Sequence, residues 1–148
     1  ISGQNDALDA VVARARDKGA RLAKRLNVAV PAHCALMENA QILLRRRLES
    51  INVKAPKTNW FSNQSANVMV NPQDVKDSLA DQMTHGVRWF DIMQKFPEYN
   101  ITIAYELGPG RTLTGLINRA NVGCNAYTTD NLRNVHVMLE MLEKSFSH

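Results

Sequence analysis

Cysteine is scarce in this chain of 148 residues, which contains only Cys34 and Cys124. Two thiols are too few for a disulfide framework, and neither has a CxxC or histidine partner at metal-ligand spacing. Long apolar runs are also missing, since none approaches the roughly 18 residues that span a bilayer. No segment has the charged, apolar and small-residue order of a signal peptide. We therefore expect a cytoplasmic protein without a metal centre or a membrane partner.

Two motifs that mark chemistry are absent as well. No serine stands in a Gly-x-Ser-x-Gly elbow, the turn that exposes a nucleophile between a strand and a helix. The serines are Ser2, Ser50, Ser62, Ser65, Ser78, Ser145 and Ser147. Gly108-Pro109-Gly110 precedes a helical pattern but lacks the GxGxxG and GxxxxGK[ST] spacings of phosphate sites. We interpret it as a structural turn in preference to a phosphate cradle.

Positive charge, by contrast, is abundant, and the net charge is +4. The basic side chains gather in two places, 14–25 and 45–47. Solvated helix faces are the simplest interpretation, and an acidic partner is the next. Nucleic acid is disfavoured because no basic stretch is interleaved with aromatic residues.

Apolar spacing predicts helices alternating with strands, and therefore an α/β fold with a largely parallel sheet. Two expected elements bear on the site: an extended strand over Leu22–Val30 and a helix that starts at Cys34. A prolyl helix start at Asn71-Pro72 and a last helix capped by Asp130 are also expected. The other expected elements are a helix around 8–15, strands within 58–70, a helix from 72 to about 83, a short helix over 87–96, a strand over 101–107, a helix around 113–117 and an apolar stretch over 122–127.

His33 has the most suggestive setting of the four histidines, because it stands where the expected strand meets the expected helix. The partial positive charge of a helix N-terminus disfavours imidazolium, which would keep the ring neutral and able to accept a proton. A histidine that only caps or packs is the alternative. His85, His136 and His148 are interpreted as structural. Cys34 is a possible thiol nucleophile, but adjacent residues leaving a strand point in different directions, so we disfavour it.

The segment around His33 resembles a family motif. Residues 28–37 read VAVPAHCALM, and the catalytic-histidine segment of bacterial malonyl-CoA:acyl-carrier-protein transacylases usually reads V-x-V-P-S-H-C-A-L-M. Further matching blocks follow in the same order, over almost the whole chain and more weakly after about Ala120. They are 52–56 (NVKAP), Gln82 with 87–89 (VRW) behind it, and 105–116 (YELGPGRTLTGL).

The resemblance implies a large hydrolase-like α/β domain with parallel strands and a small ferredoxin-like α+β subdomain inserted into it. Residues 1–30 would then be the tail of the inserted subdomain. Residues 31–148 would be the C-terminal part of the large domain. The family's nucleophile elbow, oxyanion-hole glutamine and malonate-binding arginine all lie upstream of the histidine segment, so we expect them outside this chain.

The resemblance also implies the chemistry. A serine takes malonyl from coenzyme A and passes it to the phosphopantetheine thiol of acyl-carrier protein, with His33 as the base in both half-reactions. A main-chain carbonyl orients that histidine in the family, and the matching position is Gln82. Neither Arg88 nor Arg111 occupies the place of the family's arginine. Ala32 departs from the usual serine beside the histidine, which leaves acyl-group preference less secure than acyl transfer.

The predicted function is therefore malonyl transfer from coenzyme A to acyl-carrier protein in fatty-acid synthesis. The coenzyme A thioester is the substrate, and no other cofactor is expected. The expected partners are acyl-carrier protein, malonyl-CoA and the part of the enzyme that bears the serine. One alternative is a related acyltransferase of a polyketide or malonate decarboxylase system. The other is a non-catalytic half-domain that binds carrier protein.

Overall fold

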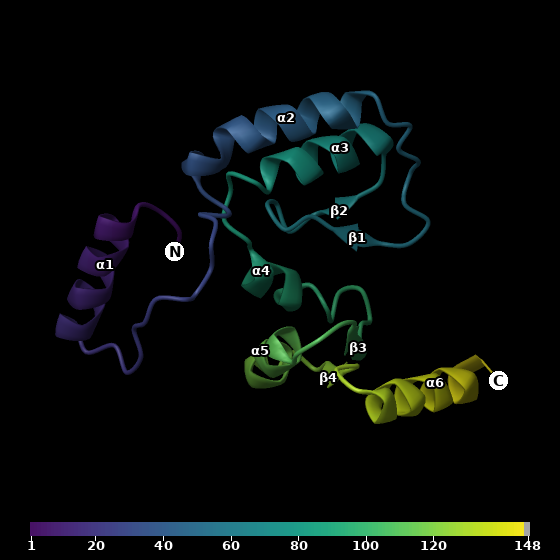
Figure 1. Cartoon of the computed structure of the whole chain (residues 1–148). Coiled ribbons are helices and arrows are strands. Elements are labelled where there is room, and N and C mark those ends of the chain that lie inside the picture. Colours follow the sequence, from purple (N-terminus) through teal and green to yellow (C-terminus); the bar gives the residue numbers. More distant parts are fainter. Residues whose placement is uncertain (147–148) are drawn as a thin grey trace. The chain divides into compact units, whose positions relative to one another are not determined.

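The computed structural model describes residues 1–146, with side chains as far as 144. The chain forms two compact units, Ile1–Trp89 and Phe90–His148 (Figure 1). The α/β class predicted from the sequence is confirmed. In chain order the elements are α1 (Asn5–Asp17), the 3-10 helix η1 (Ala35–Met37), α2 (Glu38–Glu49), β1 (Trp60–Phe61), β2 (Val68–Met69), α3 (Pro72–Asp81), α4 (Trp89–Gln94), β3 (Ile103–Glu106), α5 (Thr112–Ala120), β4 (Asn125–Thr128) and α6 (Leu132–Phe146).

Helices α2 and α3 lie side by side in the first unit (Figure 1). Arg45 of α2 pairs with Asp77 and Asp81 of α3, each at 2.6 Å. Helix α3 starts as predicted, because the Asn71 side chain accepts a hydrogen bond of 2.9 Å from the Asp74 N–H and Pro72 opens the helix. Because both aspartates lie in the C-terminal half of α3, the two ion pairs hold the end of α3 against α2.

The predicted hairpin within 58–70 is present as the antiparallel pair β1 and β2, in which Trp60 faces Met69. Its turn is anchored to α3 through two buried serines, since the Ser78 hydroxyl donates to the Ser62 hydroxyl at 2.6 Å. The turn therefore holds a fixed position on α3.

Of two further predictions for the first unit, the strand is wrong and the helix is correct except for its first turn. Residues 22–30 form no strand, because a strand needs ladder partners and the described residues offer none to this segment. Its side chains Leu22, Leu26 and Val28 are exposed accordingly. The helix expected from Cys34 opens instead as the 3-10 turn η1, and α2 begins only at Glu38.

The second unit contains the parallel strands β3 and β4, paired from Ile103 with Asn125 to Glu106 with Thr128. Helix α5 connects them, which is the βαβ arrangement that parallel strands require. Asn118 of α5 holds β4, donating to the Ala126 carbonyl at 3.2 Å and accepting from the Ala126 N–H at 3.1 Å. In the described part of the chain this is the only parallel pairing, so the predicted large parallel sheet is present as one strand pair.

The cap of α6 differs from the prediction. Asn131, not Asp130, accepts the N-terminal hydrogen bond, from the Asn134 N–H at 3.0 Å. The Asp130 carboxylate instead accepts from the side-chain amides of Asn131 and Asn134. An asparagine at this position can cap a helix as well as an aspartate, and sequence preference did not separate the two.

Several large apolar side chains are exposed, among them Leu107 at 75% and Leu132 at 78%. No helix within residues 1–146 is both long and apolar enough to cross a membrane. The predicted domain boundary at residue 30 stays a prediction.

Candidate active site

His33 stands on an unusual backbone. Its φ is 64°, in the left-handed region that residues with a Cβ adopt at a cost of about 1 kcal/mol or more. The His33 N–H donates to the Met83 carbonyl at 3.0 Å, which holds this conformation in place. Strain of this kind persists only where the surrounding structure enforces it, and it is concentrated at functional sites.

The imidazole ring is held by the neighbouring carbonyl. His33 Nδ1 lies 2.7 Å from the main-chain oxygen of Gln82. A carbonyl oxygen can only accept, so Nδ1 carries the hydrogen and donates. In the neutral ring Nε2 is then the free proton acceptor. The structure thus brings together the two residues that the sequence placed at the site, 49 positions apart in the chain.

The helix-dipole argument for His33 is weaker than the sequence suggested. Because α2 begins at Glu38, the ring stands before a single 3-10 turn and not at the mouth of an α-helix. The macrodipole effect falls off within one turn. Carbonyl orientation is therefore the interaction that supports a neutral, accepting histidine here.

A network of polar side chains fixes the distance between His33 and Gln82. Helix η1 begins two residues after His33 and leads into α2, and α3 ends immediately before Gln82. Gln41 of α2 donates to Asp81 at 2.7 Å, on the same carboxylate that binds Arg45. The two segments that meet at the site are thus joined one residue from Gln82. Sequence reasoning had assigned Arg45 to a solvated basic face, but its guanidinium is already paired.

Asn63 is the site residue that sequence reasoning missed. Its side-chain amide donates to Gln82 Oε1 at 3.3 Å, and its carbonyl accepts from the Arg88 N–H at 2.7 Å. The sequence pattern predicted only strands within 58–70, the range that contains Asn63. No spacing rule connects a hairpin turn with a loop 19 residues away, so the signal was absent from the sequence.

The other chemically active side chains are turned elsewhere. Cys34 Sγ donates to the Pro31 carbonyl at 3.1 Å, and His85 Nδ1 lies 2.8 Å from the Asp81 carbonyl at the end of α3. His136 is exposed on α6, and His148 lies outside the described residues. Within the described part of the chain His33 hydrogen-bonds only to carbonyl groups, and Ser62 and Ser78 bind each other.

The turn at Gly108-Pro109-Gly110 already has an anion at its helix. Glu106 accepts from the Leu113 and Thr114 N–H groups at the start of α5, at 3.1 and 2.8 Å. The hydrogen bond from the Thr114 N–H is the main cause that lowers the pKa of Glu106 below its usual range. These are N–H groups that a bound phosphate would need. The structural interpretation of the turn is favoured for this reason.

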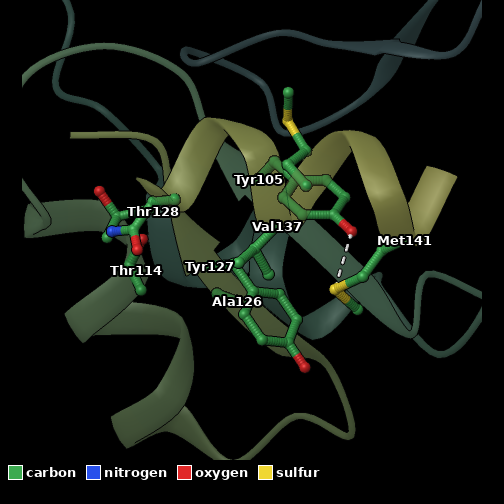
Figure 2. A pocket seen from close by; sticks show the side chains of 9 residues that line it. Tyr105, Thr114, Ala126, Tyr127, Thr128, Val137 and Met141 are labelled. Carbon is green, nitrogen blue, oxygen red and sulfur yellow. Dashed lines mark hydrogen bonds between the residues drawn. The ribbon is translucent and has the colours of Figure 1, made fainter. Parts of the chain in front are cut away.

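A cavity of about 210 Å³ lies in the second unit, beside β3, β4 and α6 (Figure 2). The Tyr105 and Tyr127 rings lie 5.8 Å apart, and the Tyr105 hydroxyl is 3.6 Å from Met141 Sδ. Among its described lining residues there is no histidine, cysteine, carboxylate, lysine or arginine. The cavity therefore lacks groups suited to acid–base or nucleophilic chemistry near neutral pH.

Among residues 1–146 no group of three or more His, Cys, Asp and Glu side chains is placed to hold an ion. Both cysteines are free, and burial raises the pKa of the Cys124 thiol.

Comparison with known proteins gives one consistent result. No family model matches the chain. The malonyl CoA-acyl carrier protein transacylase of Haemophilus influenzae is 28% identical over 142 residues, covering 96% of this chain and 46% of the relative. The enzyme of the same name from Escherichia coli K12 is 33% identical over 119 residues, covering 80% of this chain and 38% of the relative.

Solved structures agree with the sequence relatives. The acyl-carrier-protein S-malonyltransferase of Burkholderia pseudomallei superposes with a TM-score of 0.86 and 30% identity, over 93% of this chain and 45% of the other. A malonyl-transacylase in complex with a type II polyketide acyl-carrier protein gives 0.88 and 29%, with the same coverage. The chain spans less than half the length of these relatives. The predicted resemblance is confirmed: over nearly all of its length, this chain is homologous to a part of the malonyl CoA-acyl carrier protein transacylases.

Proposed function

We propose that this chain is the histidine-bearing part of an enzyme that transfers malonyl from coenzyme A to acyl-carrier protein, with His33 as general base. The contact of 2.7 Å between His33 Nδ1 and the Gln82 carbonyl carries the proposal. It leaves Nε2 unprotonated in the neutral ring, which is the state that a general base requires. The homology to transacylases supplies the reaction.

The first half-reaction begins with the serine hydroxyl, which comes from the part of the enzyme outside this chain. His33 Nε2 takes its proton while the oxygen attacks the malonyl thioester carbonyl. The tetrahedral intermediate then expels the coenzyme A thiolate, which receives the proton from His33. The products are malonyl-serine and free coenzyme A, and the histidine is neutral again.

The second half-reaction repeats these steps with the phosphopantetheine thiol of acyl-carrier protein. His33 takes the thiol proton, the sulfur attacks the malonyl-serine ester, and the serine oxygen leaves and recovers a proton from His33. The Gln82 carbonyl keeps Nδ1 protonated throughout and stabilises the imidazolium in each half-reaction, as a carboxylate does in the serine–histidine–aspartate triad.

The chain alone should be inactive. It contains no nucleophile elbow, and within residues 1–144 no serine or cysteine side chain hydrogen-bonds to His33. Neither Ser62 nor Ser78 is available as a substitute nucleophile, because both are buried and engaged with each other.

Acyl-carrier protein is the proposed macromolecular partner, because a homologous malonyl-transacylase has been solved in complex with one. Carrier proteins are acidic as a class, and the N-terminal basic segment (Arg14, Lys18, Arg21 and Lys24) is exposed and makes no ion pair with the described residues. By contrast, Arg25 is engaged by Asn5 and Asp9. Unpaired surface cations can steer an acidic partner.

The finer assignments follow from the same resemblance. Residues 1–30 are assigned to the tail of a small ferredoxin-like subdomain, and residues 31–148 to the C-terminal part of a hydrolase-like domain in a cytoplasmic enzyme. Ala32, next to His33, makes the choice of malonyl less secure than acyl transfer. A polyketide acyltransferase is the second candidate, because one matching structure is a transacylase with a type II polyketide carrier.

The test is reconstitution. Intact-mass analysis of the protein from its natural source establishes whether this segment is joined to a serine-bearing segment or accompanied by one. The complete protein is then incubated with malonyl-CoA and holo acyl-carrier protein, and malonylation of the carrier is measured by mass spectrometry. Malonylation by the complete protein and none by the 148-residue chain is expected. If the protein isolated from its natural source consists of these 148 residues alone, and no second chain bears the serine, the catalytic proposal is contradicted.

A further inference from the structure

Asn63 holds both ends of one loop, the supporting loop (residues 82–88). Its side-chain Nδ2 donates to Gln82 Oε1 at 3.3 Å, at the start of the loop, and its carbonyl accepts from the Arg88 N–H at 2.7 Å, at the end. The residues in between connect helix α3 to helix α4. One residue of the hairpin turn therefore bridges the whole loop.

The supporting loop is the segment that holds His33. The Gln82 carbonyl binds the His33 ring, and the Met83 carbonyl binds the His33 N–H. His33 itself has a φ of 64°, so its position depends on these two contacts. A shift of the Gln82 peptide would therefore move the oxygen that accepts the hydrogen bond from His33 Nδ1.

The hairpin turn that contains Asn63 is itself held in place by hydrogen bonds. The residue before it, Ser62, is fully buried, and its hydroxyl accepts from Ser78 at 2.6 Å. The same oxygen accepts from the Gln64 and Ser65 N–H groups at 3.2 and 3.3 Å. The hairpin turn is thereby fastened to α3, the helix that leads into Gln82. The hairpin turn is therefore connected to the segment around Gln82 twice: through Ser62 and α3, and through the direct contact from Asn63 to Gln82.

We propose that Asn63 is a positioning residue, which keeps the Gln82 carbonyl directed at His33 Nδ1 and so selects the imidazole tautomer that can accept a proton at Nε2. The catalytic meaning of this inference rests on the proposed function, whereas the structural statement about the tautomer does not. Where a histidine ligates a metal, losing the group that orients it from behind typically costs about tenfold to a hundredfold in affinity or activity, and we expect an effect of the same order for a histidine base. Asn63 makes no hydrogen bond to the ring among the described residues, so in this proposal it acts through Gln82.

The test compares Asn63→Ala with Gln82→Ala, which removes the other side of the same contact but retains the carbonyl. Gln64→Ala is the matched control in the same turn, because the Gln64 side chain makes no hydrogen bond with the described residues. The nitrogen chemical shifts of the His33 ring are measured by NMR at pH 8 in the complete protein, with circular dichroism as the check of folding. If one variant does not fold, the other carries the test.

The expected result is a shift of the ring from the Nδ1–H form towards a mixture in both variants, and none in the control. Malonyl transfer should show kcat lowered about tenfold to a hundredfold with KM unchanged. The double variant should resemble Gln82→Ala, because both single variants remove the Asn63–Gln82 contact and only Gln82→Ala also removes the hydrogen bond of 3.4 Å from Gln82 Nε2 to the Leu79 carbonyl. A ring that keeps its Nδ1–H form in folded Asn63→Ala and Gln82→Ala would overturn the inference. Absence of malonyl transfer by the unsubstituted protein, with the tautomer shift retained, would overturn the proposed function alone.

Discussion

At the scale of the residue, the site depends on atoms that side-chain identity does not reveal. His33 is held by two main-chain carbonyls, those of Gln82 and Met83. A carbonyl has no formal charge, so it orients the ring and favours one tautomer with less electrostatic stabilisation of imidazolium than a carboxylate would give. Cys34 stands next to His33 but donates to the Pro31 carbonyl.

That hydrogen bond gives the first prediction, for Cys34→Ser. A serine hydroxyl can make the same hydrogen bond to the Pro31 carbonyl, so the turn should be retained. Because the thiol is not the nucleophile in the proposed mechanism, malonyl transfer by the complete protein should stay within about twofold of the unsubstituted rate, well under the 1.4 kcal/mol that corresponds to tenfold. The rate of carrier malonylation is the measurement. Loss of more than about a hundredfold, in protein that folds normally, would make Cys34 a participant in the chemistry.

The sequence predicted this site only in part, again for reasons at the residue scale. The contact between His33 and the Gln82 carbonyl was expected, because a motif and an ordered set of blocks matched a known pattern. Asn63 and the Met83 carbonyl were not identified, because one is a turn residue by composition and the other is a main-chain atom. The cap of α6 was predicted one residue too early, at Asp130 and not at Asn131, because asparagine and aspartate have nearly equal preference for the N-cap position.

At the scale of the element, the structure confirms what local chemistry predicts and corrects what needs a distant partner. Asn71-Pro72 started α3 as expected, and the strands expected within 58–70 formed a hairpin. Residues 22–30 had the composition of a strand but found no neighbouring strand in the described part of the chain. Helix starts and hairpins are local, whereas a strand is stable only as part of a sheet.

Helix α5 gives the second prediction, for Glu106→Gln. The carboxylate binds the N–H groups that open α5, and the lowered pKa means that the folded state prefers the ionised form. A lowered folded pKa contributes stability above the unfolded value of about 4.3, and that contribution disappears as pH falls through the folded value. The variant should therefore unfold at a lower urea concentration at pH 7.

The same comparison at low pH is the control for Glu106. Once the pH is below the folded pKa, both proteins carry a neutral side chain at position 106, so their urea midpoints should converge. A difference between the two midpoints that is unchanged from pH 7 to low pH would show that charge at the start of α5 is not the source of the stability.

At the scale of the whole molecule, each of the two compact units exposes large apolar side chains, such as Leu26 in the first and Leu107 in the second. The chain's relatives are more than twice as long. The class of fold was predictable from alternating patterns, but the extent of the sheet was not, because β3 and β4 pair only with each other in the described residues.

The N-terminal basic segment gives the third prediction, for the pair of changes Lys18→Glu and Lys24→Glu. If these cations meet an acidic carrier protein, each reversal should raise the Kd for acyl-carrier protein by up to about fivefold, the effect of an exposed ion pair worth up to about 1 kcal/mol. Titration of the complete protein at low and high salt measures it. Binding should also weaken as salt rises.

Lys57→Glu is the matched control, because Lys57 is exposed and lies outside the N-terminal basic segment. It changes the net charge by the same amount as either single reversal. Equal weakening by Lys57→Glu and Lys18→Glu would attribute the effect to net charge. Carrier binding that does not depend on salt would remove the N-terminal basic segment from the interface.

The central claim is that His33 is the general base of malonyl transfer, and one measurement tests it most directly. It is the single-turnover rate of malonyl-serine formation by the complete protein carrying His33→Ala, with His136→Ala as the control on exposed α6. We predict that His33→Ala lowers this rate by about 10³ to 10⁶, the range found when a histidine base is removed from a serine enzyme, and that His136→Ala leaves it unchanged. A folded His33→Ala protein that forms malonyl-serine at the unsubstituted rate would contradict the claim.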